Sequence, residues 1–213
     1  MHLSDKLLEV GDLCVERGDR RLFESLALTV ATGQIVEISG SNGSGKTSLL
    51  RALAGLIHPA AGQFSWCGNK VPSAHSYSDE LLYIGHKPAV SMQFTPYENL
   101  RAFELAQGKS NLDEDRLLQA LSDVGLSGYE EEVCSRLSAG QKRRVGLARM
   151  RFTESRLWLL DEPFTAIDAK GVTTLCGWID EFVTSGGSVI FTTHQSVSFP
   201  NVVPEKLNLE AIN

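Results

Sequence analysis

Eight consecutive residues have the types and the spacing of a loop that binds phosphate. They fit the pattern G-x-x-x-x-G-K-[ST] at every specified position and read Gly40, Ser41, Asn42, Gly43, Ser44, Gly45, Lys46 and Thr47. The glycines allow backbone conformations in which successive N–H groups point at phosphate oxygens. We expect Lys46 to reach the β- and γ-phosphates of a nucleotide, and the Thr47 hydroxyl to ligate a Mg²⁺ ion that bridges them. Ser48 follows at the start of a helix, whose N-terminus adds positive potential, and it joins the nucleotide-binding candidates.

Two adjacent carboxylates, Asp161 and Glu162, follow the apolar run Leu157–Leu160. This pattern is typical of a buried parallel strand that delivers acids to the edge where open α/β sheets bind ligands. Because successive strand residues face opposite ways, the two side chains cannot have the same role. We expect Asp161 to hold the Mg²⁺ shell through water, and Glu162 to polarise the water that attacks the γ-phosphate. The alternative is an ordinary solvated strand end.

Two further segments carry residues that could contact phosphate. The last apolar strand, Val189–Thr193, ends at His194, which we expect to contact the γ-phosphate from the same sheet edge. A structural histidine is the alternative. The second segment opens a helix, and its candidate residues are Ser138, Ala139, Gly140 and Gln141. A helix start of this composition is a second candidate anion site. The basic run Lys142–Arg144 is expected to be a solvated helix face.

The flanking patterns predict how the loop is positioned. It lies between an apolar strand, Gln34–Ser39, and a helix, Ser48–Leu56, which is the context that the motif requires. Alternating apolar and polar residues in Leu7–Val30 and Gly62–Gly68 predict antiparallel strands, which form a small β layer beside the nucleotide.

The middle of the chain has a different, helical periodicity. Residues from about 87 to 150 include helical segments at Glu98–Ala106 and Asp113–Val124, with Ser110 or Asn111 placed to cap the second. We therefore expect a mostly helical insertion in an α/β core. Only a short tail is expected after His194.

Composition excludes several classes of protein. With 213 residues, 42% of them hydrophobic, the chain can bury one α/β core. Its net charge of −6 argues against nucleic acid as a partner. No apolar run approaches the roughly 20 residues that span a bilayer, and the first residues lack the layout of a secretory signal, so we expect a cytosolic chain. The cysteines, at positions 14, 67, 134 and 176, are expected to be reduced and mostly buried.

Taken together, the motifs resemble those of the ABC-type ATPase subunits. The phosphate loop, Leu137–Gln141, Leu159–Pro163, Phe164–Asp168 and His194 stand in the order of that family over nearly the whole chain. The resemblance implies an α/β P-loop NTPase fold: one domain over 1–213, with a core and β layer at about 1–86 and 151–213 and a helical subdomain at about 87–150. It also implies that ATP and Mg²⁺ are bound by a head-to-tail homodimer. In such a dimer, Ser138 and Gly140 of one copy close over the phosphate loop of the other.

A narrower resemblance links the chain to the ATP-binding subunits of the cytochrome c biogenesis haem exporter. It rests on Tyr83–Pro88, Leu137–Val145 and Leu157–Phe164. The resemblance implies a peripheral subunit on the cytoplasmic face of the membrane, docked on an integral membrane permease subunit. It further implies ATP hydrolysis coupled to haem export or to release of a haem-loaded chaperone, with haem-handling proteins as partners.

Three positions depart from the general ABC pattern. His86 stands where a glutamine normally contacts Mg²⁺ and the attacking water, and an imidazole lacks the amide oxygen. Arg17 stands where an aromatic ring usually stacks on adenine; a planar guanidinium can stack instead, and an exposed turn arginine is the alternative. Leu137–Gln141 resembles the ABC signature motif L-S-G-G-Q. Ala139 replaces the first glycine of this signature, and we expect phosphate contact to persist.

Two other functions remain open at this point. The chain could serve a different ABC transporter, or it could be a soluble ABC-type switch. Soluble relatives usually carry two such domains or a long coiled-coil insertion, neither of which this sequence has. The loop Pro88–Leu100 instead resembles the region with which transporters contact membrane helices. A kinase is disfavoured because the signature would then have no role.

Overall fold

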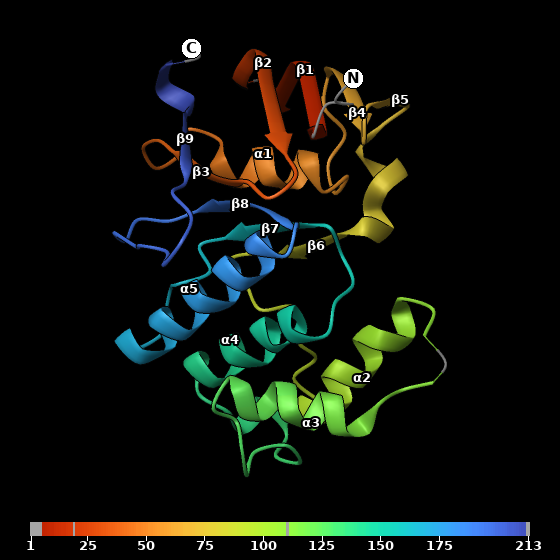
Figure 1. Cartoon of the computed structure of the whole chain (residues 1–213), viewed down its shortest axis with the longest axis vertical. Helices are drawn as coiled ribbons and strands as arrows, with labels where there is room; N and C mark the ends of the chain where they lie inside the picture. Colours follow the sequence, from red (N-terminus) through yellow and green to blue (C-terminus); the bar gives the residue numbers. More distant parts are fainter. Residues whose placement is uncertain (1–5, 19, 110, 212–213) are drawn as a thin grey trace. The chain divides into compact units, whose positions relative to one another are not determined.

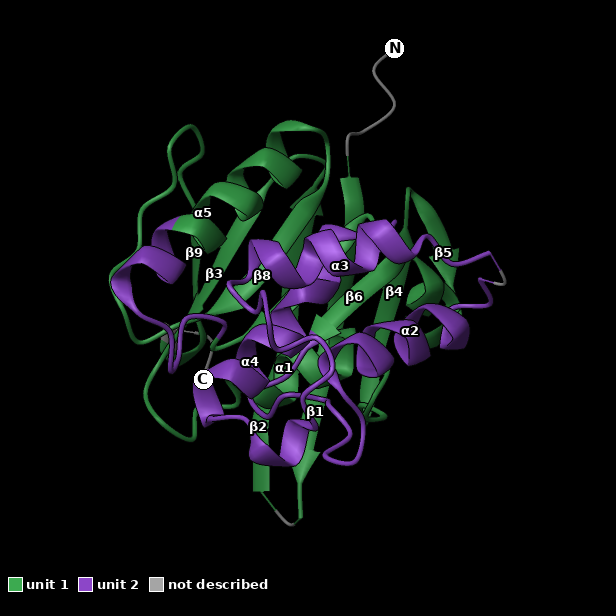
Figure 2. Cartoon of the chain, turned by 90° about the horizontal axis from the view of Figure 1, so that it is seen from below, with its two compact units in different colours: residues 1–83, 155–162, 174–213 green, residues 84–154, 163–173 purple. Residues whose placement is uncertain are grey.

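The computed structural model describes residues 6–18, 20–109 and 111–211. They divide into two compact units, shown in different colours in Figure 2. Unit 1 comprises residues 1–83, 155–162 and 174–213, and unit 2 comprises residues 84–154 and 163–173. Among the described residues, no helix is both long enough and apolar enough to cross a bilayer.

An antiparallel sheet forms one layer of unit 1. Its strand order is β2-β1-β4-β5, where β1 is Lys6–Arg17, β2 is Arg20–Ala31, β4 is Ala61–Trp66 and β5 is Asn69–Val71. Val10 pairs with Leu28 on one side and with Phe64 on the other, and all three side chains are buried. The alternation in the sequence predicts these antiparallel strands, and the structure confirms them.

A second sheet carries the catalytic candidates of unit 1. Its order is β6-β7-β8-β3-β9, where β6 is Leu81–Ile84, β7 is Leu157–Asp161, β8 is Ser188–Thr192, β3 is Ile35–Ser39 and β9 is Glu205–Asn208. Every residue of β7 and β8 is buried, as parallel pairing in the middle of a sheet requires. Asp161 and Ile38 both pair with Thr192, so three strands end at one edge.

Strand β9 lies within the short tail expected after His194, where the sequence analysis assigned no strand. Glu205–Asn208 pairs in parallel with β3, and Asn208 lies opposite Ser39, the last residue before the phosphate loop. The segment that follows β9 therefore emerges at the same sheet edge as that loop.

Helix α1, Lys46–Leu53, packs between the two sheets of unit 1 (Figure 1). Leu49, Leu50 and Leu53 are fully buried there, in one core with residues of both sheets. The helix carries Lys46 and Thr47 in its first turn, so the core fixes the position of the phosphate loop. On another part of the second sheet, Trp158 of β7 stacks on Phe182 of helix α5, Ala169–Thr184.

The described residues of unit 2 include the helices that surround its own core. They are α2, Pro96–Ala106, α3, Glu114–Asp123, and α4, Ala139–Ala148. The core includes Leu100, Leu117, Leu121, Val145 and Phe152. Short 3₁₀ turns complete the described structure: η1 at Ala74–Glu80, η2 at Cys134–Arg136, η3 at Arg149–Arg151 and η4 at Leu209–Ala211.

The cap of α3 differs from the expectation. Asp113 is the N-cap, and its carboxylate accepts a hydrogen bond from the backbone N–H of Arg116 at 3.1 Å. Asn111 does not cap the helix, and Ser110 lies outside the described residues. Aspartate and asparagine are about equally good N-caps, so the sequence did not distinguish the two positions.

Helix α2 begins with a reciprocal cap that can be tested. The Thr95 hydroxyl accepts from the Glu98 N–H at 3.1 Å, and the Glu98 carboxylate accepts from the Thr95 N–H at 2.9 Å. Thr95→Ala should lower the free energy of unfolding in urea by about 1 kcal/mol, because the Glu98 N–H loses its acceptor. Thr95→Ser keeps the hydroxyl and is the matched control. Equal losses in both variants would show that the methyl group, and not the cap, matters.

Candidate nucleotide-binding site

The phosphate loop connects β3 to α1 through backbone conformations that need glycine. Gly45, the N-cap of α1, has a φ of 104°, and a Cβ built there would lie 3.1 Å from a ring carbon of Phe23. Gly40 has a φ of 147°, and its Cβ would lie 2.6 Å from the Ser44 hydroxyl oxygen. A side chain at either position would displace the loop.

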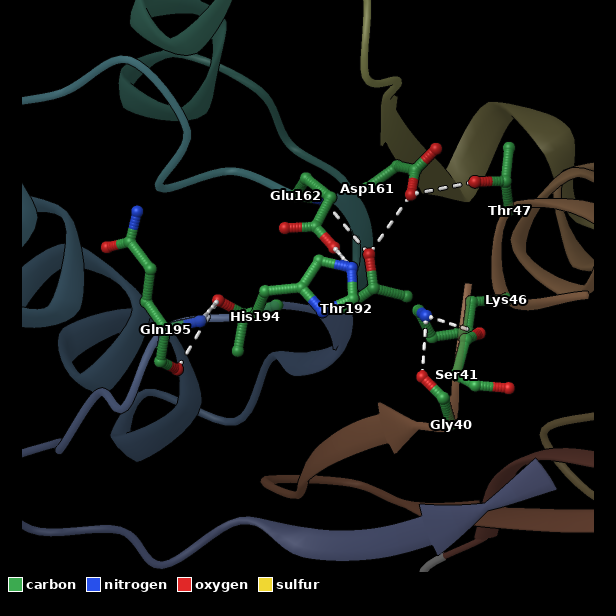
Figure 3. Close-up of polar contacts among 10 residues, drawn as sticks. Gly40, Ser41, Lys46, Thr47, Asp161, Glu162, Thr192, His194 and Gln195 are labelled. Atoms are coloured by element: carbon green, nitrogen blue, oxygen red, sulfur yellow. Dashed lines mark hydrogen bonds and ion pairs between the residues drawn. The ribbon is translucent and has the colours of Figure 1, made fainter. Parts of the chain in front are cut away.

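Inside the loop, the Lys46 ammonium is bound by carbonyl oxygens. Lys46 is only 9% exposed, and its Nζ donates to the Gly40 carbonyl at 2.8 Å and to the Ser41 carbonyl at 3.1 Å (Figure 3). The buried Ser44 hydroxyl has no hydrogen-bond partner among the described residues. A cation hydrogen-bonded to neutral carbonyls and an unpaired hydroxyl are both available to an anion.

Asp161, at the end of β7, accepts hydrogen bonds from two other elements. Its Oδ1 accepts from the Thr47 hydroxyl of α1 at 3.1 Å and from the Thr192 hydroxyl of β8 at 3.0 Å. The carboxylate is 2% exposed. The Thr192 hydroxyl oxygen also accepts a hydrogen bond from the Glu162 N–H at 3.0 Å. Thr192 therefore links Asp161 to Glu162 (Figure 3).

Glu162 has a left-handed backbone and lies against His194. Its φ is 53°, an uncommon value for glutamate that costs conformational energy. The His194 Nε2 lies 3.3 Å from the Glu162 Oε1, and the two side chains are 56% and 14% exposed. Other non-glycine residues, among them Asp12 and Ser25, also have a positive φ, so the role of Glu162 stays a prediction.

Two residues at this edge were missed by the sequence analysis. Thr192 is one; its place at the end of the apolar run, two residues before His194, was the available signal. Glu210 is the other: its Oε1 accepts the Ser41 N–H of the phosphate loop at 2.9 Å. This contact holds the pKa of Glu210 below its ordinary value. No sequence pattern pointed to Glu210.

The signature residues lie in unit 2, at the start of α4. The exposed Ser138 is the N-cap: its hydroxyl accepts the Gln141 N–H at 3.2 Å, and the Gln141 side chain accepts the Ser138 N–H at 2.9 Å. Ala139 is exposed, and a Cβ on Gly140 would lie 3.1 Å from the Ala166 carbonyl oxygen. A side chain at Gly140 would therefore have to shift this neighbour by a few tenths of an ångström.

The basic run after the signature is not a uniformly solvated face, which corrects the expectation. Arg143 is 4% exposed, and its Nη1 donates to the Gly85 carbonyl at 2.6 Å and to the His86 carbonyl at 3.3 Å. Arg144 pairs with Asp168 at 2.9 Å. This arginine and, to a greater extent, the Gly171 N–H hold the pKa of Asp168 below its usual range.

Arg17 and His86, two of the three positions that depart from the general ABC pattern, are both on the surface. Arg17 is the exposed last residue of β1 and lies opposite Arg20 of β2. His86 is an exposed residue of unit 2, whose backbone carbonyl contacts Arg143. Neither a base-stacking role for Arg17 nor a metal contact for His86 is tested by these positions, and both stay predictions.

The cysteines are free thiols: Cys134 and Cys176 are buried, Cys14 is half-buried and Cys67 is exposed.

Comparison with known proteins gives consistent matches. A family model described as "ABC transporter" matches residues 23–165. The "Cytochrome c biogenesis ATP-binding export protein CcmA" of Hahella chejuensis is 45% identical over 208 residues, 97% of this chain and 97% of that protein. The protein of the same description from Escherichia coli O157:H7 is 44% identical over 202 residues, 94% of each chain.

The solved structures agree on the fold. A putative ABC transporter ATP-binding protein from Pyrococcus furiosus has a TM-score of 0.80 at 25% identity, and the match covers 96% of this chain and 98% of that one. An ATP-binding subunit of an ABC transporter has a TM-score of 0.79 at 28% identity, covering 88% and 79%. These matches confirm the predicted ABC ATPase fold. The chain belongs to the ABC transporter family of ATP-binding proteins and, within it, to the cytochrome c biogenesis ATP-binding export proteins, CcmA.

Proposed function

We propose that this chain binds and hydrolyses ATP as the ATP-binding subunit of an export complex in cytochrome c biogenesis. The hydrolysis would drive haem export or the release of a haem-loaded chaperone. The observation that carries the catalytic part is the connected set Thr47, Asp161, Thr192 and Glu162 beside the phosphate loop (Figure 3). The biological part rests on relatives about 45% identical over nearly the full chain, whose names specify cytochrome c biogenesis and export.

ATP would bind by replacing contacts that the loop now makes with itself. Lys46 would exchange its two carbonyl acceptors for β- and γ-phosphate oxygens, which accept more strongly because they are charged. The Ser44 hydroxyl would gain a partner. The proposed ATP-binding residues are Gly40, Ser41, Asn42, Gly43, Ser44, Gly45, Lys46, Thr47 and Ser48, with Arg17 on the adenine.

The oxygens beside the loop fit Mg²⁺. The Thr47 hydroxyl and the Asp161 carboxylate lie within one hydrogen bond of each other, and Mg²⁺ prefers one or two such oxygen ligands together with phosphates and waters. Mg²⁺ bound there would neutralise charge on the β- and γ-phosphates. We assign the ion to Thr47 and Asp161. His86, which offers nitrogen in place of an amide oxygen, is proposed as a hydrogen-bonding group near the γ-phosphate.

Glu162 is the proposed group that orients the attacking water. Its N–H donates to Thr192, and its carboxylate lies against His194, which is proposed to contact a γ-phosphate oxygen as well. The water oxygen forms a bond to the γ-phosphorus while the bond from that phosphorus to the β,γ-bridging oxygen breaks. The water proton passes toward Glu162, and ADP and phosphate are released.

The signature residues are proposed to complete the site of a second copy. Ser138, Ala139, Gly140 and Gln141 begin α4 in unit 2, so the helix N-terminus and the Ser138 hydroxyl present an anion-binding end. A head-to-tail homodimer would form two such composite sites. The dimer is proposed to dock on an integral membrane permease subunit at the cytoplasmic face of the membrane.

The role of Glu162 is tested by Glu162→Gln in the membrane-bound complex. ATP turnover should fall by at least about 100-fold, because the amide cannot accept the water proton, while the affinity for ATP stays within a few-fold of the parent. Phosphate release and nucleotide binding measure the two effects. The control is Glu24→Gln, which neutralises an exposed carboxylate that pairs with Arg21 on strand β2. Turnover at the parental rate in Glu162→Gln would refute the assignment.

The composite dimer is tested by combining two inactive subunits. Lys46→Ala removes the phosphate ligand, and Ser138→Arg blocks the signature, so either homodimer should hydrolyse no ATP. A complex isolated through different tags on the two variants contains one intact site, and it should recover up to about half of the parental turnover. If the mixed complex is as inactive as both homodimers, the two motifs do not meet across a dimer.

The cytochrome c biogenesis role is tested by affinity isolation of the tagged chain from native membranes in mild detergent. We expect a polytopic membrane protein, haem-handling proteins and the absorption spectrum of haem. Recovery of a permease with a solute-binding protein would retain the transporter ATPase and eliminate the haem role. Recovery of the chain alone would favour a soluble switch.

A further inference from the structure

One peptide group of the phosphate loop lies between two opposite charges. The Gly40 carbonyl accepts from the Lys46 ammonium at 2.8 Å, and the N–H of the same peptide, that of Ser41, donates to the Glu210 carboxylate at 2.9 Å. A cation on the oxygen and an anion on the N–H polarise the peptide in the same direction, so each hydrogen bond strengthens the other. Glu210 therefore stabilises the contact that keeps Lys46 on the loop carbonyls.

The chain around Glu210 holds its carboxylate in place. Strand β9 pairs with β3 up to the pair Ser39 and Asn208, which lies just before the loop. Leu209 is 1% exposed, and it packs in the core beside Gly40. The Glu210 N–H donates to the Asn208 side-chain oxygen at 3.0 Å. A buried leucine and a short turn thus direct an otherwise exposed glutamate to the loop.

The carboxylate is ionised at neutral pH. Its pKa lies below the ordinary value, chiefly because of the hydrogen bonds to Ser41 and also because of the nearby Lys46 charge. A bound nucleotide places further negative charge at this loop and needs Lys46 on its phosphates. Both requirements oppose the arrangement that Glu210 stabilises.

We infer that Glu210 is a positioning residue that stabilises the contact of Lys46 with the carbonyls of the phosphate loop and thereby weakens nucleotide binding. The inference rests on the proposed function, because it concerns the affinity of the same ATP site. It assigns Glu210 no contact with the reacting atoms. Its expected effect is on nucleotide affinity and on the KM for ATP, with kcat unchanged.

The test measures the Kd of ADP and ATP, and the KM and kcat of hydrolysis, in the full-length protein within its membrane complex. Glu210→Ala removes both the charge and the acceptor, and it should lower Kd and KM by about 3- to 10-fold. Glu210→Gln keeps an acceptor for the Ser41 N–H without the charge, and it should give a smaller decrease. High salt should reduce the difference between Glu210→Gln and the parent, since it screens exposed charges.

Glu205→Gln is the matched control, because it neutralises a carboxylate of β9 that accepts from Gln34 and not from the loop. It should leave Kd within about 2-fold of the parent, since its charge lies farther from the phosphates. An unchanged or higher Kd in both Glu210 variants would overturn the inference while nucleotide binding by the parent stands. If neither parent nor variants bind nucleotide, the proposed function fails and the inference fails with it.

Discussion

The buried carboxylate of Asp161 joins three elements that are far apart in the sequence. It accepts one hydrogen bond from Thr47 at the start of α1 and one from Thr192 at the end of β8, while it ends β7 itself. A polar group that is 2% exposed is costly to bury unless hydrogen-bond donors of this kind satisfy it. The positions of the phosphate loop and of the strand ends are therefore coupled: displacing any one of the three leaves a buried charge less well solvated.

The strain at Glu162 follows from the same connection. Thr192 donates to Asp161 and accepts from the Glu162 N–H, so one hydroxyl orients two consecutive residues of the chain. Parallel pairing of β7 with β8 places Thr192 directly opposite Asp161, which makes this geometry possible. The backbone then turns at Glu162 with a φ of 53°, and the turn brings its side chain to His194. Local strain is thus offset by hydrogen bonds to a neighbouring strand.

Much of this arrangement could be predicted from the sequence, because its signals are local. The loop has a fixed spacing of glycines and lysine, and β7 and β8 are uninterrupted apolar runs. Strand β9 could not be predicted in this way: Glu205–Asn208 has three exposed residues and one half-buried residue, so no apolar pattern marks it. It pairs with β3 through backbone groups, which no side-chain pattern reports. The roles assigned to the site residues remain predictions.

Buried polar groups were the other source of error. Arg143 has the charge of a surface residue, yet its guanidinium is satisfied by the Gly85 and His86 carbonyls. Those acceptors come from residues more than fifty positions away in the sequence, so their proximity is set by the tertiary fold. Glu210 is exposed, but its partner, the Ser41 N–H, is likewise far away in the sequence. A charge pattern in the sequence gives the number of charged groups and their order, but the partner of each depends on the packing.

Both candidate anion sites satisfy part of their own hydrogen-bonding capacity without a ligand. Lys46 donates to loop carbonyls, and at the start of α4 Ser138 and Gln141 satisfy each other's N–H groups. By helix geometry, the N–H groups of Ala139 and Gly140 have no acceptor within α4, so this end retains an attraction for an anion. The net free energy of nucleotide binding would be the difference between the energy of the nucleotide's own contacts and the energy of the loop contacts that it replaces. The internal contacts of the loop therefore lower the net binding energy of a nucleotide there.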